Sequence, residues 1–300
     1  MNDSKIFEAK ATLQLAADMS KYYYNAPLIV CYSGGKDSDV LLDIAKKYLK
    51  PDEFEVLNSH TTVDAPETVY HIRDVFRELE KDGIKATIKM PRYKGEPTSM
   101  WKLIVDKRIP PTRIMRYCCK VLKEASTPNR MAAVGVREAE SINRRGRDVF
   151  STRGKTKADA EYRSLQHTNT MFLIDKKYKD TPHHECALIE AAKKNKDTIV
   201  NPIYHWTDAD VWTYAKENNI KMNPLYAKGY SRVGCIGCPL SSNQKKELEA
   251  YPKYKLNYIK AFDRMLRERE TEHEVHQVRP QDRRRSLSLV AWRRSLANQN

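Results

Sequence analysis

The sequence predicts an α/β fold: a doubly wound, mainly parallel sheet followed by a helical C-terminal extension. The apolar run at residues 28–32 is typical of a buried parallel strand, and the stretch 40–48 behind it is typical of an amphipathic helix. Strand-like and helix-like stretches alternate in the same way further along the chain, which favours a parallel sheet. Residues 243–270 predict a long charged helix beyond that sheet.

The remaining elements keep this alternation. Proline suits a first helical turn and Thr or Asp suits a cap, so helices are predicted at 5–22, from Pro66 to about residue 79, and after Thr207 or Asp208. Apolar stretches predict strands at 54–57, 84–88, 131–136 and 199–203. Residues 146–196 are rich in Lys, Arg, Thr and Asp and interrupt the pattern. We interpret them as an insertion, either a mobile lid or a solvated surface excursion.

The six residues Ser33–Ser38 read Ser-Gly-Gly-Lys-Asp-Ser and stand at the turn between the first strand and its helix. Glycines there let the backbone approach a ligand closely, and the free N–H groups at a helix start favour an anion. Ser33, Lys36 and Ser38 add side-chain donors, so the expected ligand is a phosphate group. The spacing matches neither the Walker loop nor the dinucleotide-binding loop. The alternative is a Gly-Gly turn that only joins a strand to a helix.

The positive net charge of the chain predicts that it binds an anionic partner or substrate. Its 300 residues carry 54 Lys and Arg against 39 Asp and Glu, a net charge of +15. This balance favours a polyanionic partner such as nucleic acid, or an anionic substrate; part of the excess also suits a nucleotide site. No stretch approaches the ~20 apolar residues of a membrane span, and the first residues lack the apolar core of a signal peptide. We therefore expect a cytoplasmic protein without a membrane partner.

Four of the six cysteines form two groups, the adjacent pair Cys118 and Cys119 and the C-x-x-C of Cys235 and Cys238. Cytosolic thiols stay reduced, so clustered cysteines indicate metal binding or catalysis. Structural zinc usually takes two C-x₂₋₄-C knuckles, and adjacent side chains diverge and chelate one ion poorly. A cluster with separate irons tolerates neighbouring ligands better, which favours a [4Fe–4S] cluster. Zinc remains an alternative, as do thiols that act in redox chemistry or only pack.

These motifs bear a family resemblance. Ser33–Ser38 resembles the PP-loop signature SGGxDS of the adenine-nucleotide alpha-hydrolase superfamily, which has the HUP-type α/β fold and binds ATP or an adenylyl sulfate. The whole pattern resembles the phosphoadenylyl-sulfate (PAPS) reductase family, in particular the branch in which a Cys-Cys pair and a C-x-x-C ligate one [4Fe–4S] cluster. Further matching segments, in the family order over about residues 27–245, are Asp64–Thr68, Gly135–Ser141, Trp206–Trp212 and Asn223–Tyr226.

The resemblance implies a set of site residues. The catalytic candidates are Lys36 and Arg137 for the phosphates and Asp37 for a Mg²⁺ ion. The predicted nucleotide-binding residues are Ser33, Gly34, Gly35, Lys36, Asp37, Ser38, Thr61, Asp64, Gly135 and Arg137, and the predicted cluster ligands are Cys118, Cys119, Cys235 and Cys238. We expect a PP-loop nucleotide-binding domain over 1–245, with the insertion at about 146–196, and a charged helix and basic tail over 246–300. Homodimers are common among these relatives, and a homodimer is one of the assemblies that we consider for this chain.

One departure from the family matters most. True sulfonucleotide reductases resemble one another in a catalytic cysteine on a C-terminal Glu-Cys-Gly-Leu-His segment, whereas no cysteine follows Cys238 here. Nucleophilic attack on sulfur needs a thiolate, so that mechanism lacks its nucleophile. Cys186, in the insertion, is either a substitute or an inert thiol. The chain therefore resembles more closely the ATP pyrophosphatases of sulfur insertion, including those of DNA phosphorothioation.

This resemblance implies ATP cleavage to AMP and pyrophosphate, activation of an acceptor oxygen, and delivery of sulfur, with a cysteine desulfurase as a candidate donor. A DNA or RNA acceptor needs a basic track, for which Arg144, Arg145, Arg147 and the Arg-rich tail with Trp292 are candidates; ordinary solvated charges are the alternative. Two other functions stay open. One is reduction of an adenylyl sulfate by an external thiol or Cys186, and the other is an accessory nucleotide-binding subunit.

Overall fold

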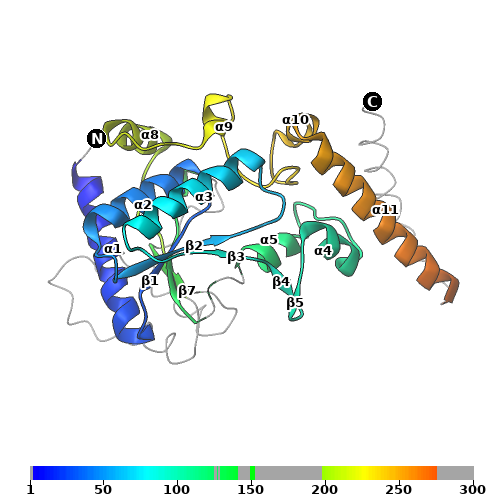
Figure 1. Cartoon of the computed structure of the whole chain (residues 1–300), viewed down its shortest axis with the longest axis horizontal. Coiled ribbons are helices and arrows are strands. Elements are labelled where there is room, and N and C mark those ends of the chain that lie inside the picture. Colours follow the sequence, from blue (N-terminus) through cyan, green and yellow to red (C-terminus); the bar gives the residue numbers. More distant parts are fainter. Residues whose placement is uncertain (1–2, 125–126, 128, 141–148, 153–197, 276–300) are drawn as a thin grey trace. The chain divides into compact units, whose positions relative to one another are not determined.

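The computed structural model describes residues 3–124, 127, 129–140, 149–152 and 198–275 (Figure 1). The chain divides into two compact units. The sheet unit comprises Met1–Ser59, Pro66–Lys89 and Ala125–Gly234, and the helical unit comprises His60–Ala65, Met90–Glu124 and Cys235–Asn300. Most of the expected insertion at about 146–196 and most of the basic tail lie outside the described residues. Phe150–Thr152, near the expected start of the insertion, is described and forms a strand of the central sheet. The domain boundary expected after residue 245 stays a prediction.

A six-stranded, mainly parallel sheet forms the centre of the sheet unit, and it confirms the predicted fold class. Its strands lie in the order β3 (Ala86–Lys89), β2 (Phe54–Ser59), β1 (Leu28–Cys31), β6 (Met131–Ala133), β8 (Thr198–Val200) and β7 (Phe150–Thr152). All neighbours are parallel except β7 and β8. In the register of the central strands, Val30 lies opposite Val56 on one side and Ala133 on the other.

The strand order reverses at β1 and β6, because the chain runs outward from β1 through β2 to β3 and, on the other side, from β6 to β8. In open α/β sheets, ligands bind at such a switch point, beyond the carboxyl ends of the strands. The segments that leave β1 and β6 at this point contain Ser33–Ser38 and Gly135–Arg137. The topology thus brings together two of the segments that the sequence singled out.

Helices pack on this sheet through a continuous apolar core. Helix α1 (Asp3–Tyr24) packs along β1, β6 and β8 and against α2 (Lys36–Tyr48), which in turn contacts α8 (Asp208–Glu217). Helix α3 (Pro66–Lys81) lies against β3 and the short α9 (Pro224–Ala227). Fully buried side chains such as Leu13, Leu28, Leu41 and Ile44 fill the space between α1, α2 and β1, and such burial is the main favourable term in folding.

Two predicted strands end three residues before their apolar runs do. The run 131–136 pairs only as far as Ala133, although the Val134 N–H still donates to the Val200 carbonyl at 2.9 Å, and the chain then turns away at Gly135. The run 199–203 ends its pairing at Val200, because Pro202 carries no N–H and the Tyr204 N–H bonds back to the Asn201 carbonyl at 3.1 Å. The apolar runs correctly indicated buried residues, but they did not indicate where the hydrogen-bonded pairing of each strand ends.

The helical unit is built on α4 (Met100–Lys107), α5 (Tyr117–Leu122), α10 (Gln244–Ala250) and α11 (Pro252–Val275), with a small hairpin of β4 (Arg92–Tyr93) and β5 (Glu96–Pro97). Helices α4 and α11 pack together, with the Trp101 ring 4.8 Å from Tyr258. The helical C-terminal region is confirmed. The single helix predicted over 243–270 is wrong, because Pro252 ends α10 and begins α11. Within the described part of the chain, none of the helices combines the length and the apolar composition that a membrane crossing requires.

Candidate nucleotide site and cysteine set

The loop between β1 and α2 requires glycine at Gly34. Its φ of +70° is a left-handed conformation that side chains rarely adopt, and a Cβ at Gly34 would lie 2.9 Å from Cγ1 of Ile72 and 3.2 Å from Cγ2 of Thr68. Both neighbours belong to α3, so the loop passes directly against that helix. Two physical constraints, conformation and space, therefore fix the residue type.

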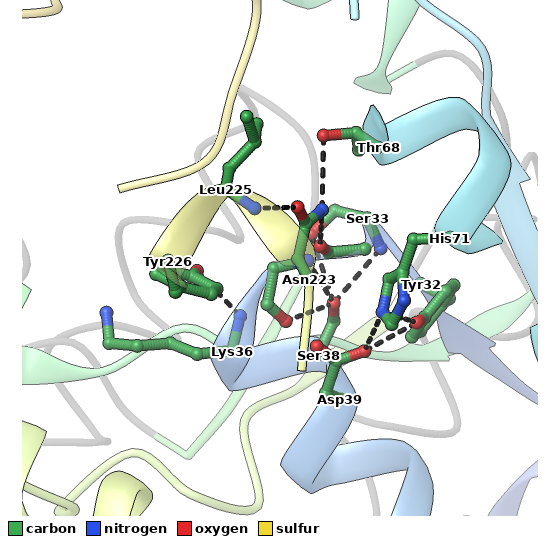
Figure 2. A network of polar contacts seen from close by, with 12 residues as sticks. Tyr32, Ser33, Lys36, Ser38, Asp39, Thr68, His71, Asn223, Leu225 and Tyr226 are labelled. Carbon is green, nitrogen blue, oxygen red and sulfur yellow. Dashed lines mark hydrogen bonds and ion pairs between the residues drawn. The ribbon is translucent and has the colours of Figure 1, made fainter. Parts of the chain in front are cut away.

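The Ser38 hydroxyl holds the loop in shape (Figure 2). It accepts the backbone N–H groups of Ser33 at 3.3 Å and Gly35 at 3.1 Å, and it donates to the Gly35 carbonyl at 2.8 Å. The Ser33 hydroxyl also donates to it at 3.2 Å. One side chain in the first turn of α2 thus satisfies the backbone groups on which a tight turn depends.

A compact group of alternating charges surrounds the start of α2. The guanidinium of Arg137 is fully buried and donates to Oδ1 of Asp37 at 2.6 Å, to the Trp206 carbonyl at 3.1 Å, and to Asp208. The Lys36 ammonium lies 3.5 Å from Oδ2 of Asp37 and 3.4 Å from Oδ1 of Asp208. Burial raises the pKa of Asp208, but the bonds from Arg137 and the charge of Lys36 outweigh it and lower that pKa.

Gly135 permits this group to form. A Cβ there would lie 2.9 Å from the carbonyl oxygen of Asp37 and 3.0 Å from its carbonyl carbon. Backbone does not yield as a flexible side chain can, so any larger residue would push the segment after β6 away from α2. Lys36, Asp37, Gly135 and Arg137, which the sequence selected as site residues, are therefore brought together by the structure.

Three residues of the site were not predicted as site residues. Asn223 is buried, donates from Nδ2 to the Gly34 carbonyl at 2.7 Å, and lies 3.1 Å from the Thr68 hydroxyl. The Tyr226 hydroxyl accepts the Lys36 N–H at 2.8 Å. Asp208 completes the charge group described above. The segments Trp206–Trp212 and Asn223–Tyr226 matched the family pattern, and that match was the signal that these residues belong to the site.

A buried polar group lies behind the loop (Figure 2). The Tyr32 hydroxyl donates to Oδ1 of Asp39 at 2.5 Å, and Nε2 of His71 lies 3.0 Å from the same carboxylate oxygen. Burial and the neighbouring charge of Asp39 raise the pKa of Tyr32 well above its usual range. These contacts join β1, α2 and α3 and so support the loop that connects the first two.

The structure places two other predicted nucleotide ligands, Thr61 and Asp64, in the helical unit beside Cys235. The Thr61 N–H donates to the Asp64 carboxylate at 3.0 Å, and the Cys235 thiol lies 3.6 Å from the Thr61 hydroxyl. Asp64 also forms an antiparallel bridge with Cys235. The contact of Thr61 and Asp64 with a nucleotide stays a prediction.

All four predicted cluster ligands lie in the helical unit and are half-buried. The Cys118 thiol donates a hydrogen bond to the Cys119 sulfur. This hydrogen bond and the charges of Arg116 and Lys123 lower the pKa of Cys119, against the opposing effect of burial. The Arg116 guanidinium donates to the Cys119 sulfur at 3.7 Å. Burial raises the pKa of Cys235, and the Lys123 charge opposes that rise.

The donor set fits a cluster chemically, since four thiols lie in one unit and two cations stand beside them to offset thiolate charge. In the described residues, however, no three His, Cys, Asp or Glu side chains already converge on one point as metal ligands. Several other candidates lie outside the described residues: Cys186, Arg144, Arg145, Arg147, Trp292 and the arginines of the tail.

A match to a family model and several similar proteins describe the relatives of this chain. The phosphoadenosine phosphosulfate reductase domain matches residues 27–241. An adenosine 5'-phosphosulfate reductase of Anoxybacillus flavithermus is 22% identical over 76% of this chain and 79% of its own length. An uncharacterized protein of Methanocaldococcus jannaschii is 28% identical over 71% of this chain and 36% of its own length, and a second is 25% identical over 78% and 48%. The chain thus spans less than half of these two archaeal proteins.

Solved structures show more distant similarity. The PAPS reductase of Candida auris aligns with a TM-score of 0.41 and 15% identity over 73% of this chain and 87% of that one. The U34-tRNA thiolase NcsA of Methanococcus maripaludis, solved with its [4Fe-4S] cluster, aligns with a TM-score of 0.42 and 14% identity over 93% and 82%. The domain match covers most of the chain, together with the loop, the charge group and both cysteine motifs, and on that ground the chain belongs to the PAPS reductase family.

Proposed function

We propose that this protein is a PP-loop ATP pyrophosphatase that activates a nucleic-acid substrate by adenylylation for sulfur incorporation. The observation that carries the proposal is the charge group at the switch point of the sheet. It sets a buried arginine and a nearly buried lysine beside two carboxylates, at the start of a helix whose loop is already folded. Cations and helix N–H groups there suit phosphates, and one or two carboxylates suit Mg²⁺.

Each side chain has a definite part in this reaction. Lys36 and Arg137 would neutralise the phosphates, and Asp37, with Asp208, would hold Mg²⁺. An oxygen of the acceptor attacks the α-phosphorus, the bond from that phosphorus to the bridging oxygen breaks, and pyrophosphate leaves. A sulfur nucleophile then replaces the adenylated oxygen, which departs with AMP. Such chemistry depends chiefly on positioning and charge neutralisation.

The four cysteines support the sulfur half of the proposal. Cys118, Cys119, Cys235 and Cys238 would ligate a [4Fe–4S] cluster, which when bound would hold or deliver the sulfur or act as a structural link. Arg116 and Lys123 lie beside these thiols and offset their negative charge.

A nucleic-acid acceptor is supported by the charge of the helical unit. Residues 90–124 carry nine Lys and Arg against three Asp and Glu. Within this segment Ile114 is 90% exposed and Met115 is half exposed, and Arg113 and Arg116 flank them. Positive charges contact phosphates, and exposed apolar side chains can lie against unstacked bases. The proposed acceptor is therefore a nucleic acid, either DNA, as in phosphorothioation, or RNA, as in thiolation.

The test is turnover of ATP by the protein purified without oxygen. Labelled AMP and pyrophosphate should appear, and Lys36→Ala should abolish them. Lys46→Ala is the matched control, because Lys46 lies on the same helix and pairs with Asp82 at the surface. Iron and acid-labile sulfide should be present and should be lost on Cys119→Ser. ATP cleavage by Lys36→Ala at the rate of the natural protein would refute the role of the loop.

Reduction of an adenylyl sulfate is the second candidate, favoured by the similarity to the Anoxybacillus reductase along most of both chains. It predicts sulfite release from adenosine 5'-phosphosulfate in the presence of a thiol, lost on Cys186→Ser if that residue is the nucleophile. Binding of ATP without turnover of either nucleotide would instead support an accessory subunit.

A further inference from the structure

Tyr226 makes a contact that the proposed reaction does not use. Its hydroxyl accepts the backbone N–H of Lys36 at 2.8 Å (Figure 2), and Lys36 is the first residue of α2. The tyrosine belongs to α9, which Asn223 caps by accepting the Leu225 N–H at 3.0 Å. Asn223 also holds the Gly34 carbonyl, so α9 is anchored directly beside the loop.

This contact competes with phosphate. The first N–H groups of a helix have no partner within the helix, and after a glycine-rich loop they are the donors that a phosphate oxygen takes. The Tyr226 hydroxyl already occupies one of them. Burial and the carboxylates of Asp37, Asp39 and Asp208 raise the pKa of Tyr226, so its oxygen is a neutral acceptor. A phosphate oxygen is charged, and charge-assisted hydrogen bonds are roughly twice as strong as neutral ones.

We propose that Tyr226 is a gate of the nucleotide site: its hydroxyl gives up the Lys36 N–H to a phosphate oxygen of the incoming nucleotide. The inference rests on the phosphate site proposed above. Only the side chain has to move, since Asn223 pins the start of α9. Every phosphate that binds has to break this hydrogen bond, so the gate lowers phosphate affinity in general. A ligand that places a charged oxygen at this N–H recovers most of the loss, and in this way the gate contributes to ligand selection.

The ring of Tyr226 provides a way to observe the movement. It packs edge-on against Trp212, with the ring centroids 5.1 Å apart, and Trp212 is 40% exposed. Displacement of the tyrosine changes the surroundings of that indole. Its fluorescence should therefore change when phosphate binds.

Tyr226→Phe is the decisive variant, because it keeps the ring and removes the oxygen. We expect calorimetry to show inorganic pyrophosphate and ATP binding about three- to tenfold more tightly than to the natural protein, since no competing hydrogen bond has to be broken. Tyr70→Phe is the matched control, as Tyr70 lies exposed on α3 and should leave affinity unchanged. Trp212→Phe identifies which part of the fluorescence change comes from that indole.

Each result decides the proposal. Weaker binding to Tyr226→Phe would show that the hydroxyl is a ligand of the phosphate and would overturn the gate. Unchanged affinity of Tyr226→Phe would overturn the gate as well. The proposed function would survive this outcome if the natural protein binds pyrophosphate and Lys36→Ala does not. Failure of the natural protein to bind either probe would overturn both.

Discussion

The phosphate loop of the sheet unit and the cysteine set of the helical unit differ in how far their side chains are already arranged for a ligand. Around the loop, Ser38, Asn223 and Arg137 make hydrogen bonds of 2.6–3.3 Å to backbone and carboxylate partners. Around the thiols, the hydrogen bonds that join sulfur to Arg116 and Thr61, at 3.7 and 3.6 Å, have ordinary lengths for sulfur. Among the described residues, however, no three potential metal ligands converge on one point. The loop is thus preorganised by the protein, whereas the final arrangement of the thiols depends on what they bind.

Removing Arg137 should have the largest effect on the sheet unit. Arg137→Ala leaves Lys36 as the cation that Asp37 and Asp208 share. Loss of the buried guanidinium and of its bond to the largely buried Asp37 costs about 3 kcal/mol of unfolding free energy. Urea unfolding measures this loss, and release of pyrophosphate should cease. Arg137→Lys retains the charge without the planar fork and should recover stability in part only. An unchanged unfolding midpoint in Arg137→Ala would show that the charge group does not stabilise the unit.

Two glycines allow the same perturbation in each unit. Gly34 and Gly237 both have a φ of +70°, and a Cβ on either would meet a neighbour at 2.9 Å, Ile72 in one case and Tyr258 in the other. We expect Gly34→Ala and Gly237→Ala to cost about 2–4 kcal/mol each, from backbone strain plus overpacking. The first should weaken ATP binding and the second should lower iron content.

The control for both variants is Gly83→Ala. Gly83 has a φ of +74°, but a Cβ there would meet nothing within 4 Å. Its cost should therefore be strain alone, about 1 kcal/mol. If Gly34→Ala lowered iron content as strongly as ATP binding, the loop and the thiols would not be independent sites, and the comparison drawn above would be wrong.

The smallest effect concerns Asp210, on the rim of the sheet unit. Burial raises its pKa, but the Lys5 bond at 2.5 Å and two bonds with Thr207 hold that pKa at about 2, below the usual 3.8. The carboxylate therefore stabilises the fold above about pH 4 and loses this effect as the pH falls toward 2. Asp210→Asn should cost about 1 kcal/mol at neutral pH, given solvent screening and the lost cap.

Urea unfolding at several pH values tests this prediction. The difference between Asp210→Asn and the natural protein should be constant from pH 7 to about pH 4 and should shrink below it. Glu249→Gln, which alters an exposed pair with Lys245 at 3.9 Å, is the control and should show no difference. A difference that grew on acidification would contradict the direction of the Asp210 pKa.

Local sequence patterns predicted those elements whose conformation depends on residues close together in the chain. The strand β1, the loop and α2 follow one another within about 20 residues, and Thr207 caps α8 as expected. The partners that complete the site are distant in the chain: Asn223 reaches Gly34 across 189 positions, and Tyr226 reaches Lys36 across 190. No periodicity encodes such contacts, because they arise only when the sheet order and the loop geometry are known.

The repeated passage of the chain between the two units has a consequence for how such proteins can evolve. The polypeptide passes from one unit to the other after Ser59, Ala65, Lys89, Glu124 and Gly234. Neither unit is a continuous length of gene, so neither can be acquired, duplicated or discarded by a single recombination event. A lineage that no longer needs the thiols loses them most directly by point substitution, which leaves the surrounding helices in place. Related proteins should accordingly retain the helical unit even where its cysteines have been replaced.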